Sequence, residues 1–222
     1  MKHMKQLPQR LSIFTLGLLV MALGIVLIIV ADFGASPWDV LHVGLYYQFG
    51  LTIGTWSIIV GVVILATSSI MLKQWPQFGA YLNMLLVGIF IDMYLMIPFL
   101  VEPNSMIGKL TMFIIGVFIY AYGMGIYLSS QLGAGPRDSL MLALNKLTKW
   151  KVSSIRWIME VIVLIIGWVL GGPVFIGTIV FCLLIGPVVG FALPHCQKNT
   201  DKLLNKIEQK NIGKQIGRGA SL

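Results

Sequence analysis

The sequence predicts an all-α polytopic membrane protein, and three observations lead to this fold class. Of the 222 residues, 57% are hydrophobic and only 11% are charged, whereas a soluble domain carries about 25% charged residues. Four stretches contain no Asp, Glu, Lys or Arg, and each could supply the roughly 20 apolar residues that a transmembrane helix needs: residues 11–31, 50–72, 110–136 and 161–197. A short motif also appears twice, as GASPWD at residues 34–39 and as GAGPRD at residues 133–138.

Six transmembrane helices are expected, over residues 11–31, 53–72, 78–98, 107–130, 153–171 and 174–194. The last uncharged stretch is too long for one helix at about 1.5 Å per residue, so the GGP sequence at residues 171–173 divides it. The segments that follow the two motifs are shorter and contain polar residues, which favours re-entrant or short half-helices. Making both of them full spans would give eight membrane segments, and the sequence leaves that alternative open.

The basic residues predict the orientation of the spans. With the N-terminus in the cytoplasm, 15 of the 16 Lys and Arg residues lie on the cytoplasmic side, and Lys109 lies outside. The predicted parts are a cytoplasmic N-terminus (1–10), a first membrane repeat (11–98), an outer loop (99–106), a second repeat (107–194) and a basic cytoplasmic tail (195–222).

The positive charge of the inner face and tail has a membrane explanation. A basic inner face predicts contact with anionic lipid, and the net charge of +8 does not call for nucleic acid as a partner. The tail carries a lysine at every fourth position from Lys198 to Lys214, which predicts a weakly amphipathic helix on the inner leaflet that frays near Gly213.

The repeated motif belongs to a longer internal repeat. With an offset of 99 residues, an ordered set of positions in the first half matches the second, including Gly17 with Gly116 and Gly24 with Gly123; near the end the offset is 98, where Gly79 matches Gly177. Three spans in each half would place the halves in opposite orientations. The sequence therefore predicts a 3+3 inverted-topology repeat, an arrangement common among secondary transporters.

Each motif is expected to break one helix and begin another. Gly34 and Gly133 allow the chain to turn, and Pro37 and Pro136 suit the first turn of the next helix. Asp39 and Asp138 then lie where a negative charge favours a helix N-terminus.

Two interpretations of these aspartates remain open. They are either helix caps that were duplicated with the gene, or polar or cation-binding groups facing a cavity shared by the two half-helices.

At these motifs the chain resembles the YczE/YyaS/YitT family of bacterial membrane proteins, and most closely its YczE-like branch. The resemblance rests on DFGASPWDVL, on QLGAGPRDSLM and on a Gly, Asn, Gly and Asp pattern from Gly79 to Asp92, and it covers about residues 10–195. It implies a multi-pass protein of the bacterial plasma (inner) membrane and names no substrate.

Further charged residues in or near the spans are candidates for binding a solute or ion. Asp92 lies well inside the third span, where an ionisable residue is costly, and it is either a proton or cation site or a hydrated residue near the outer interface. His42 follows Asp39 by three residues, so the two share a helix face and form either a proton relay or a simple polar contact. Arg156 and Glu160 are four residues apart and are expected to pair.

Arg137 and Trp38 occupy equivalent positions of the two motifs. Arg137 either binds an anionic substrate or belongs to the positive inner face, while Trp38 is expected in an interfacial aromatic belt.

No catalytic motif, metal site or cofactor motif is recognised, so an enzyme is not expected. Two hypotheses remain: a secondary transporter or permease of an unknown small solute, and a non-transporting accessory or regulatory membrane protein. A polar cavity between the halves would favour the first. A packed centre with the carboxylates at the interfaces would favour the second.

Overall fold

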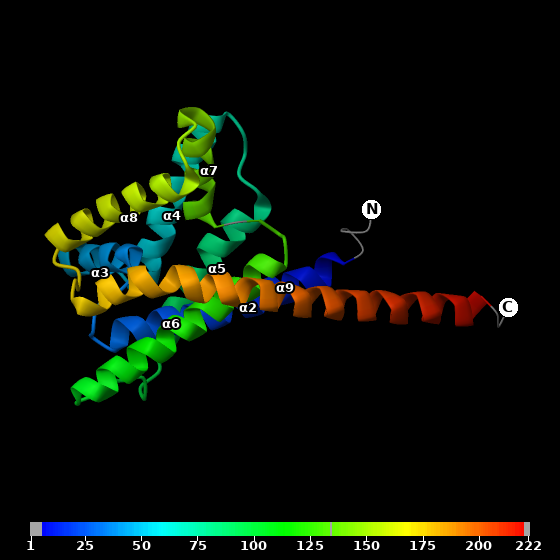
Figure 1. The fold of residues 1–222 in the computed structure, drawn as a ribbon, viewed down its shortest axis with the longest axis horizontal. Helices are drawn as coiled ribbons and strands as arrows, with labels where there is room; N and C mark the ends of the chain where they lie inside the picture. Colours follow the sequence, from blue (N-terminus) through cyan, green and yellow to red (C-terminus); the bar gives the residue numbers. More distant parts are fainter. Residues whose placement is uncertain (1–5, 134, 220–222) are drawn as a thin grey trace.

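The computed structural model of the chain is built of helices (Figure 1). It describes residues 6–133 and 135–219, with side chains up to residue 209. Within these residues there are eight helices: α2 (Leu7–Val30), α3 (Pro37–Phe49), α4 (Ile53–Leu72), α5 (Phe78–Leu95), α6 (Met106–Ser129), α7 (Pro136–Thr148), α8 (Val152–Val169) and α9 (Ile176–Gly219).

Six of the described helices, α2, α4, α5, α6, α8 and α9, are long and apolar enough to cross a membrane. They fall on the six predicted spans with small shifts at most ends, such as α2 beginning at Leu7 because Pro8 suits a first helical turn, whereas α9 continues well beyond residue 194. Helices α3 and α7 have 13 residues each, or about 20 Å at the usual helical rise. They are too short to cross a hydrocarbon core of about 30 Å, which argues against eight full spans.

The outer surface of the bundle is apolar. Large hydrophobic side chains are exposed along the spans, among them Ile59, Val63, Ile162, Ile166 and Trp168. In water such a surface would be unfavourable, whereas in a bilayer it meets lipid tails at no cost. The chain is therefore a multi-pass membrane protein whose spans contact the bilayer.

Helices α2 and α6 pack against each other along their length and form the centre of the core. They run antiparallel, since Gly17 lies against Tyr127 and Gly24 lies against Tyr120. A Cβ atom at Gly24 would lie 2.3 Å from the backbone nitrogen of Tyr120, and one at Gly123 would lie 2.3 Å from that of Met21. Glycine at these positions lets the two backbones touch.

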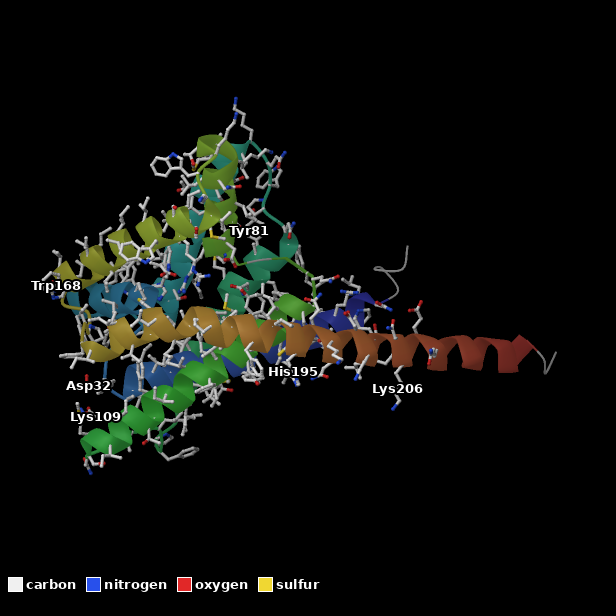
Figure 2. All side chains as sticks on the ribbon, in the orientation of Figure 1. Asp32, Tyr81, Lys109, Trp168, His195 and Lys206 are labelled. Atoms are coloured by element: carbon white, nitrogen blue, oxygen red, sulfur yellow. The ribbon has the colours of Figure 1, made fainter. Side chains whose placement is uncertain are left out.

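Basic residues hold both ends of this helix pair. Arg10 on α2 donates to the carbonyl of Ser130 at 2.9 Å and to Oε1 of Gln131 at 3.3 Å. At the opposite end, Lys109 on α6 donates to Asp32 at 2.9 Å (Figure 2) and also pairs with Glu102. Arg10 and Lys109 are equivalent under the 99-residue offset, and so are Asp32 and Gln131.

Several further contacts occur in matching pairs, although the α4–α5 contact has no comparable α8–α9 counterpart. Helix α5 packs on α2 as α9 packs on α6, and α3 packs on α8 as α7 packs on α4. The short helices thus lie against a span of the opposite half. At the α3–α8 contact, a Cβ at Gly44 would lie 2.7 Å from the carbonyl oxygen of Gly167.

The tail differs from the prediction of a separate segment that frays near Gly213. Helix α9 runs unbroken to Gly219 and extends beyond the bundle (Figure 1). Packing explains part of this continuity: Thr200 shares a hydrogen bond with Ser129 at 2.7 Å, Leu204 is buried, and Gln6 donates to Glu208 at 3.1 Å. The last span therefore continues as a helix that packs on the ends of α6 and α2.

Candidate functional site

A cavity of about 110 Å³ with both polar and apolar lining residues lies among the helices, and all eight described helices contribute to its lining. Its apolar wall includes Met21, Met84, Met124, Met141, Met159 and Phe181. Its polar lining consists of Ser36, His42, Ser57, Asn83, Tyr120, Tyr127, Arg137, Asp138, Arg156 and Glu160. The flexible thioethers of the methionines make this wall adaptable in shape.

Both short helices begin at this cavity. Pro37 and Pro136, the first residues of α3 and α7, line it. The turn before each helix needs glycine, because φ is +123° at Gly34 and +133° at Gly133. Ala134, the second residue of the GAGPRD motif, lies outside the described residues.

Each turn rests on the start of a long helix from the opposite half. The backbone N–H of Gly177 on α9 donates to the carbonyl of Phe33 at 2.9 Å. In the equivalent place, a Cβ at Gly79 on α5 would lie 2.3 Å from the carbonyl oxygen of Leu132. The glycines that match between the halves are thus the residues on which the two turns pack.

Asp39 is hydrogen-bonded to the N-cap of its own helix. Its side chain is 1% exposed, its backbone N–H donates to Oγ of Ser36 at 3.2 Å, and the Ser36 hydroxyl donates back to its carboxylate. Ser36 is the N-cap of α3, and Asp39 supports this cap by accepting a hydrogen bond from the Ser36 hydroxyl. It is absent from the cavity lining, and this placement favours the capping interpretation.

His42 lies one turn further along α3, with its ring at the cavity. Its Nδ1 atom is 3.7 Å from Oδ1 of Asp39, which is beyond hydrogen-bond distance, and has no hydrogen-bond partner. The side chain is 2% exposed. An unpaired polar atom with so little exposure is costly unless a ligand or water supplies a partner.

Arg137 and Asp138 begin α7 and both line the cavity. The guanidinium carbon of Arg137 lies 4.7 Å from the centroid of the Trp38 ring, which places the cation over the ring face. Asp138 interacts with the backbone N–H of Gly135, the N-cap of its helix. Both aspartates therefore lie at a helix start, but only Asp138 also lines the cavity.

Arg156 and Glu160 pair as their four-residue spacing predicts, with 3.0 Å between Nε and Oε1. They lie on α8 at the cavity, so the pair belongs to the site and is not only an interfacial contact. Their equivalents in the first half are Ser57 and Gly61, which also line the cavity and carry no charge.

Asp92 lies away from the cavity, at the start of α4. It accepts from the hydroxyl of Thr52 at 2.5 Å and from the backbone N–H of Gly54 at 2.8 Å. The carboxylate of α5 therefore caps the N-terminus of the neighbouring helix, where its charge is favoured. This contact accounts for a charged residue in the span without invoking a binding role.

Three features of the site were not identified from the sequence. Trp38 is 6% exposed and lies at the cavity, so its assignment to an interfacial belt was wrong. Its equivalence to Arg137 was the signal that could have placed it at the centre. Asn83 stood out only as part of the Gly79–Asp92 pattern, and the two tyrosines of α6 gave no signal, because uncharged residues in a span are indistinguishable from packing residues. Among the described residues, no three His, Cys, Asp or Glu side chains cluster as metal ligands would.

The fold and the site together define a polytopic α-helical membrane protein with a cavity lined by both of its halves. The chain belongs to the YczE/YyaS-like membrane proteins, and its residues 8–194 match the family described as "Family of unknown function (DUF6198)". This confirms the family to which the motifs pointed.

Three relatives illustrate the similarity. The chain is 42% identical to the "Uncharacterized membrane protein YczE" of Bacillus subtilis (strain 168), over 86% of this chain and 88% of that protein. It is 30% identical to the "Uncharacterized protein YyaS" of the same organism, over 84% and 93% of the two chains. An "Uncharacterized protein" of Haemophilus influenzae is 31% identical, over 82% and 83%. No solved structure matches the chain.

Proposed function

We propose that the protein is a small secondary transporter or permease of the bacterial plasma membrane, whose solute binds in the central cavity. The observation that carries the proposal is that both short helices begin at one cavity lined by both halves of the chain. Broken helices that begin at a shared site between two repeats are the usual solute site of secondary transporters. Transport requires no catalytic group, so the proposal assigns no enzymatic activity.

The proposal includes a 3+3 inverted-topology repeat with re-entrant half-helices α3 and α7. Its support is that α2 and α6, which are equivalent in sequence, pack antiparallel, as equivalent helices of an inverted repeat must. The Arg10 and Lys109 contacts add to this, since equivalent residues hold opposite ends of the same helix pair. Two similar halves in opposite orientations can exchange conformations and so open the cavity to either side.

Both termini are proposed to lie in the cytoplasm. The support is the excess of basic residues on that side and the neutralisation of the one outer lysine, Lys109, by Asp32 and Glu102. The exposed lysines of α9, such as Lys202 and Lys206, are then available to anionic lipid of the inner leaflet.

The alternative, an accessory or regulatory membrane protein, has less support. It predicts a packed centre with carboxylates at the ends of the spans, whereas Asp138 and Glu160 lie at the cavity. Charged groups within the membrane-spanning part of a protein are costly to maintain and are typical of a solute path.

The test of alternating access needs no knowledge of the solute. Ser57, which lines the cavity, is replaced by Cys in a chain whose Cys182 and Cys196 have been changed to Ala. A membrane-impermeant maleimide is then added to intact cells and, separately, to inside-out vesicles. A transporter exposes the cavity to each side in turn, so labelling is expected from both.

The matched control is Ser68→Cys on the same helix, because Ser68 is 3% exposed and lies away from the cavity. This residue is expected to stay unlabelled from both sides. If Ser57→Cys is labelled from one side only, or from neither, the transporter proposal fails and the accessory role becomes the better explanation.

A further inference from the structure

The groups around the cavity fall into two sets, those with a partner and those without. The acidic groups have partners: Glu160 pairs with Arg156, and Asp138 interacts with the N-cap of its own helix. Asp39 is held by Ser36 behind the cavity wall. Each of these carboxylates therefore has at least one partner within the protein.

The donors are in the opposite situation. Within the described part of the chain, Arg137 makes no hydrogen bond and no ion pair, and its one specific contact is the face of the Trp38 ring. That contact orients the guanidinium but leaves its N–H groups unused, since a ring face occupies none of the five donors. An arginine held in place with free donors is arranged to bind a carboxylate or another oxyanion.

Two further polar atoms at the cavity lack partners. Nδ2 of Asn83 has no acceptor although the side chain is only 6% exposed, and Nδ1 of His42 has no partner in a side chain that is 2% exposed. Both residues line the cavity. Buried polar groups in a native protein are nearly always paired, so these atoms indicate a ligand that supplies the missing partners.

The half-helices add a positive field to the same place. Helices α3 and α7 both direct their N-termini at the cavity, where Pro37 and Pro136 line it. Each helix N-terminus carries the equivalent of about half a positive charge. Asp39 and Asp138 offset part of this field from the first turns of the two helices, and the part that remains acts in the same direction as the free guanidinium.

We infer that the cavity binds a small anion, a carboxylate or comparable oxyanion, with Arg137 as its charge partner and Asn83 and His42 as additional hydrogen-bonding groups. The inference rests on the proposed function, since it names the class of solute for that site. The cavity of about 110 Å³ is smaller than an engineered cavity of about 150 Å³ that holds benzene. Ions of the size of acetate, lactate or phosphate therefore suit it better than larger metabolites.

The experiment is a titration of the purified full-length protein in detergent, read as the shift in melting temperature. Sodium chloride, acetate, lactate and phosphate are each compared with sodium gluconate, whose anion is too large for the cavity. Ammonium gluconate and tetramethylammonium gluconate test for cation binding. A saturable rise in melting temperature is expected with at least one small anion and with neither cation.

The decisive variants change the charge partner. Arg137→Gln is expected to raise the dissociation constant for the anion by about tenfold or more, the loss typical of one charge-assisted contact, while Arg137→Lys retains part of the affinity. Lys146→Gln is the matched control, because Lys146 is an exposed residue on the same helix away from the cavity. It is expected to bind as the unmodified protein does. Asn83→Leu gives an independent measure if Arg137→Gln does not fold, and should also weaken binding.

Three results would overturn the anion site: no small anion stabilises the protein, Arg137→Gln binds as well as the unmodified protein, or a cation stabilises it in a manner lost in Asp138→Asn. Flux measured in proteoliposomes separates this inference from the proposed function. Anion binding without flux would support the anion site and contradict the transporter proposal. Flux of a neutral or cationic solute that does not depend on Arg137 would support the transporter proposal and contradict the anion site.

Discussion

Arg137 and Trp38 occupy the same position in the two copies of the motif, and in the folded protein they touch, with the guanidinium carbon 4.7 Å from the ring centroid. One half of the chain supplies a cation where the other supplies an aromatic ring. The two equivalent positions could come together only because both half-helices begin at the same cavity. The difference between the copies is thus located at the proposed solute site.

The Trp38 ring is predicted to position Arg137 for the anion. Trp38→Phe keeps an aromatic face and should change the dissociation constant for the anion less than threefold, while Trp38→Ala should raise it by more, because a cation–π contact contributes about 0.5–2 kcal/mol. Truncating this buried ring should also lower the free energy of unfolding by about 3–5 kcal/mol. Titration and thermal melting measure the two effects. Trp157→Ala on the exposed face of α8 is the control for losing a tryptophan, and equal binding by Trp38→Ala and the unmodified protein would disprove the positioning role.

The two repeated aspartates are predicted to differ in their effect on binding. Asp39 is a buried cap away from the cavity, whereas Asp138 lines it. Asp39→Asn should leave the anion dissociation constant unchanged. Asp138→Asn removes a negative charge beside the bound anion and should lower that constant several-fold.

Thermal melting of both variants checks that each remains folded, since Asn is itself a good residue at a helix start. Equal effects of the two substitutions on anion binding would mean that the burial of Asp39 does not separate it from the solute.

Asp92 is predicted to act through stability. It caps α4 through Thr52 and the N–H of Gly54, so Asp92→Ala leaves the partly buried N–H of Gly54 without its acceptor. The expected loss is about 1–3 kcal/mol, measured as a lower melting temperature. Asp92→Asn keeps one acceptor oxygen and should recover about half of the loss. Normal stability of Asp92→Ala together with abolished anion binding or flux would instead place Asp92 in the solute path.

The helices were predictable because their signals are local. Charge-free stretches and the polar breaks between them predict where α4 and α6 begin and end to within one residue of the expected limits, and Pro136 predicts the first turn of α7. The pairing of Arg156 with Glu160 was predictable for the same reason, since both lie on one helix face.

Contacts between distant segments gave weaker signals. Asp92 was a candidate functional residue because its hydrogen-bond partners, Thr52 and Gly54, belong to the start of a different helix. No local sequence pattern indicates that a carboxylate of one helix caps the N-terminus of another. The tail was expected to separate from the last span, because its burial depends on Ser129 and Gln6, which lie far away in sequence.

The matching glycines Gly79 and Gly177 are predicted to be intolerant of a side chain. A Cβ atom at Gly177 would lie 2.3 Å from the carbonyl oxygen of Phe33, and one at Gly79 equally close to that of Leu132. Because both neighbours are backbone atoms of the motif turns, Gly→Ala at either position should destabilise the protein by roughly 1–3 kcal/mol. Gly186→Ala on α9 is the matched control, since nothing lies within 4 Å of the added atom. This control should be neutral or slightly stabilising, and similar melting temperatures for Gly177→Ala and Gly186→Ala would contradict the predicted clash.

The orientation of the halves is the remaining prediction, and labelling of single cysteines tests it. Asn104 lies in the loop between the halves and Lys149 follows α7, and both residues are exposed. In a chain whose Cys182 and Cys196 have been changed to Ala, Asn104→Cys should react with an impermeant maleimide added to intact cells. Lys149→Cys should react only in inside-out vesicles, because the basic residues around it mark the cytoplasmic side.

The two positions provide a stringent test because they report on opposite faces of the same second half. An odd number of spans in each half is what inverts the second copy relative to the first. If both cysteines react from one face, the second half does not cross the membrane as proposed. If Asn104→Cys reacts only from the cytoplasm, the N-terminus lies outside. Opposite labelling in the predicted sense would place GASPWD toward the outer face and GAGPRD toward the inner face, so that the two half-helices carrying Trp38 and Arg137 approach their contact from opposite sides of the membrane.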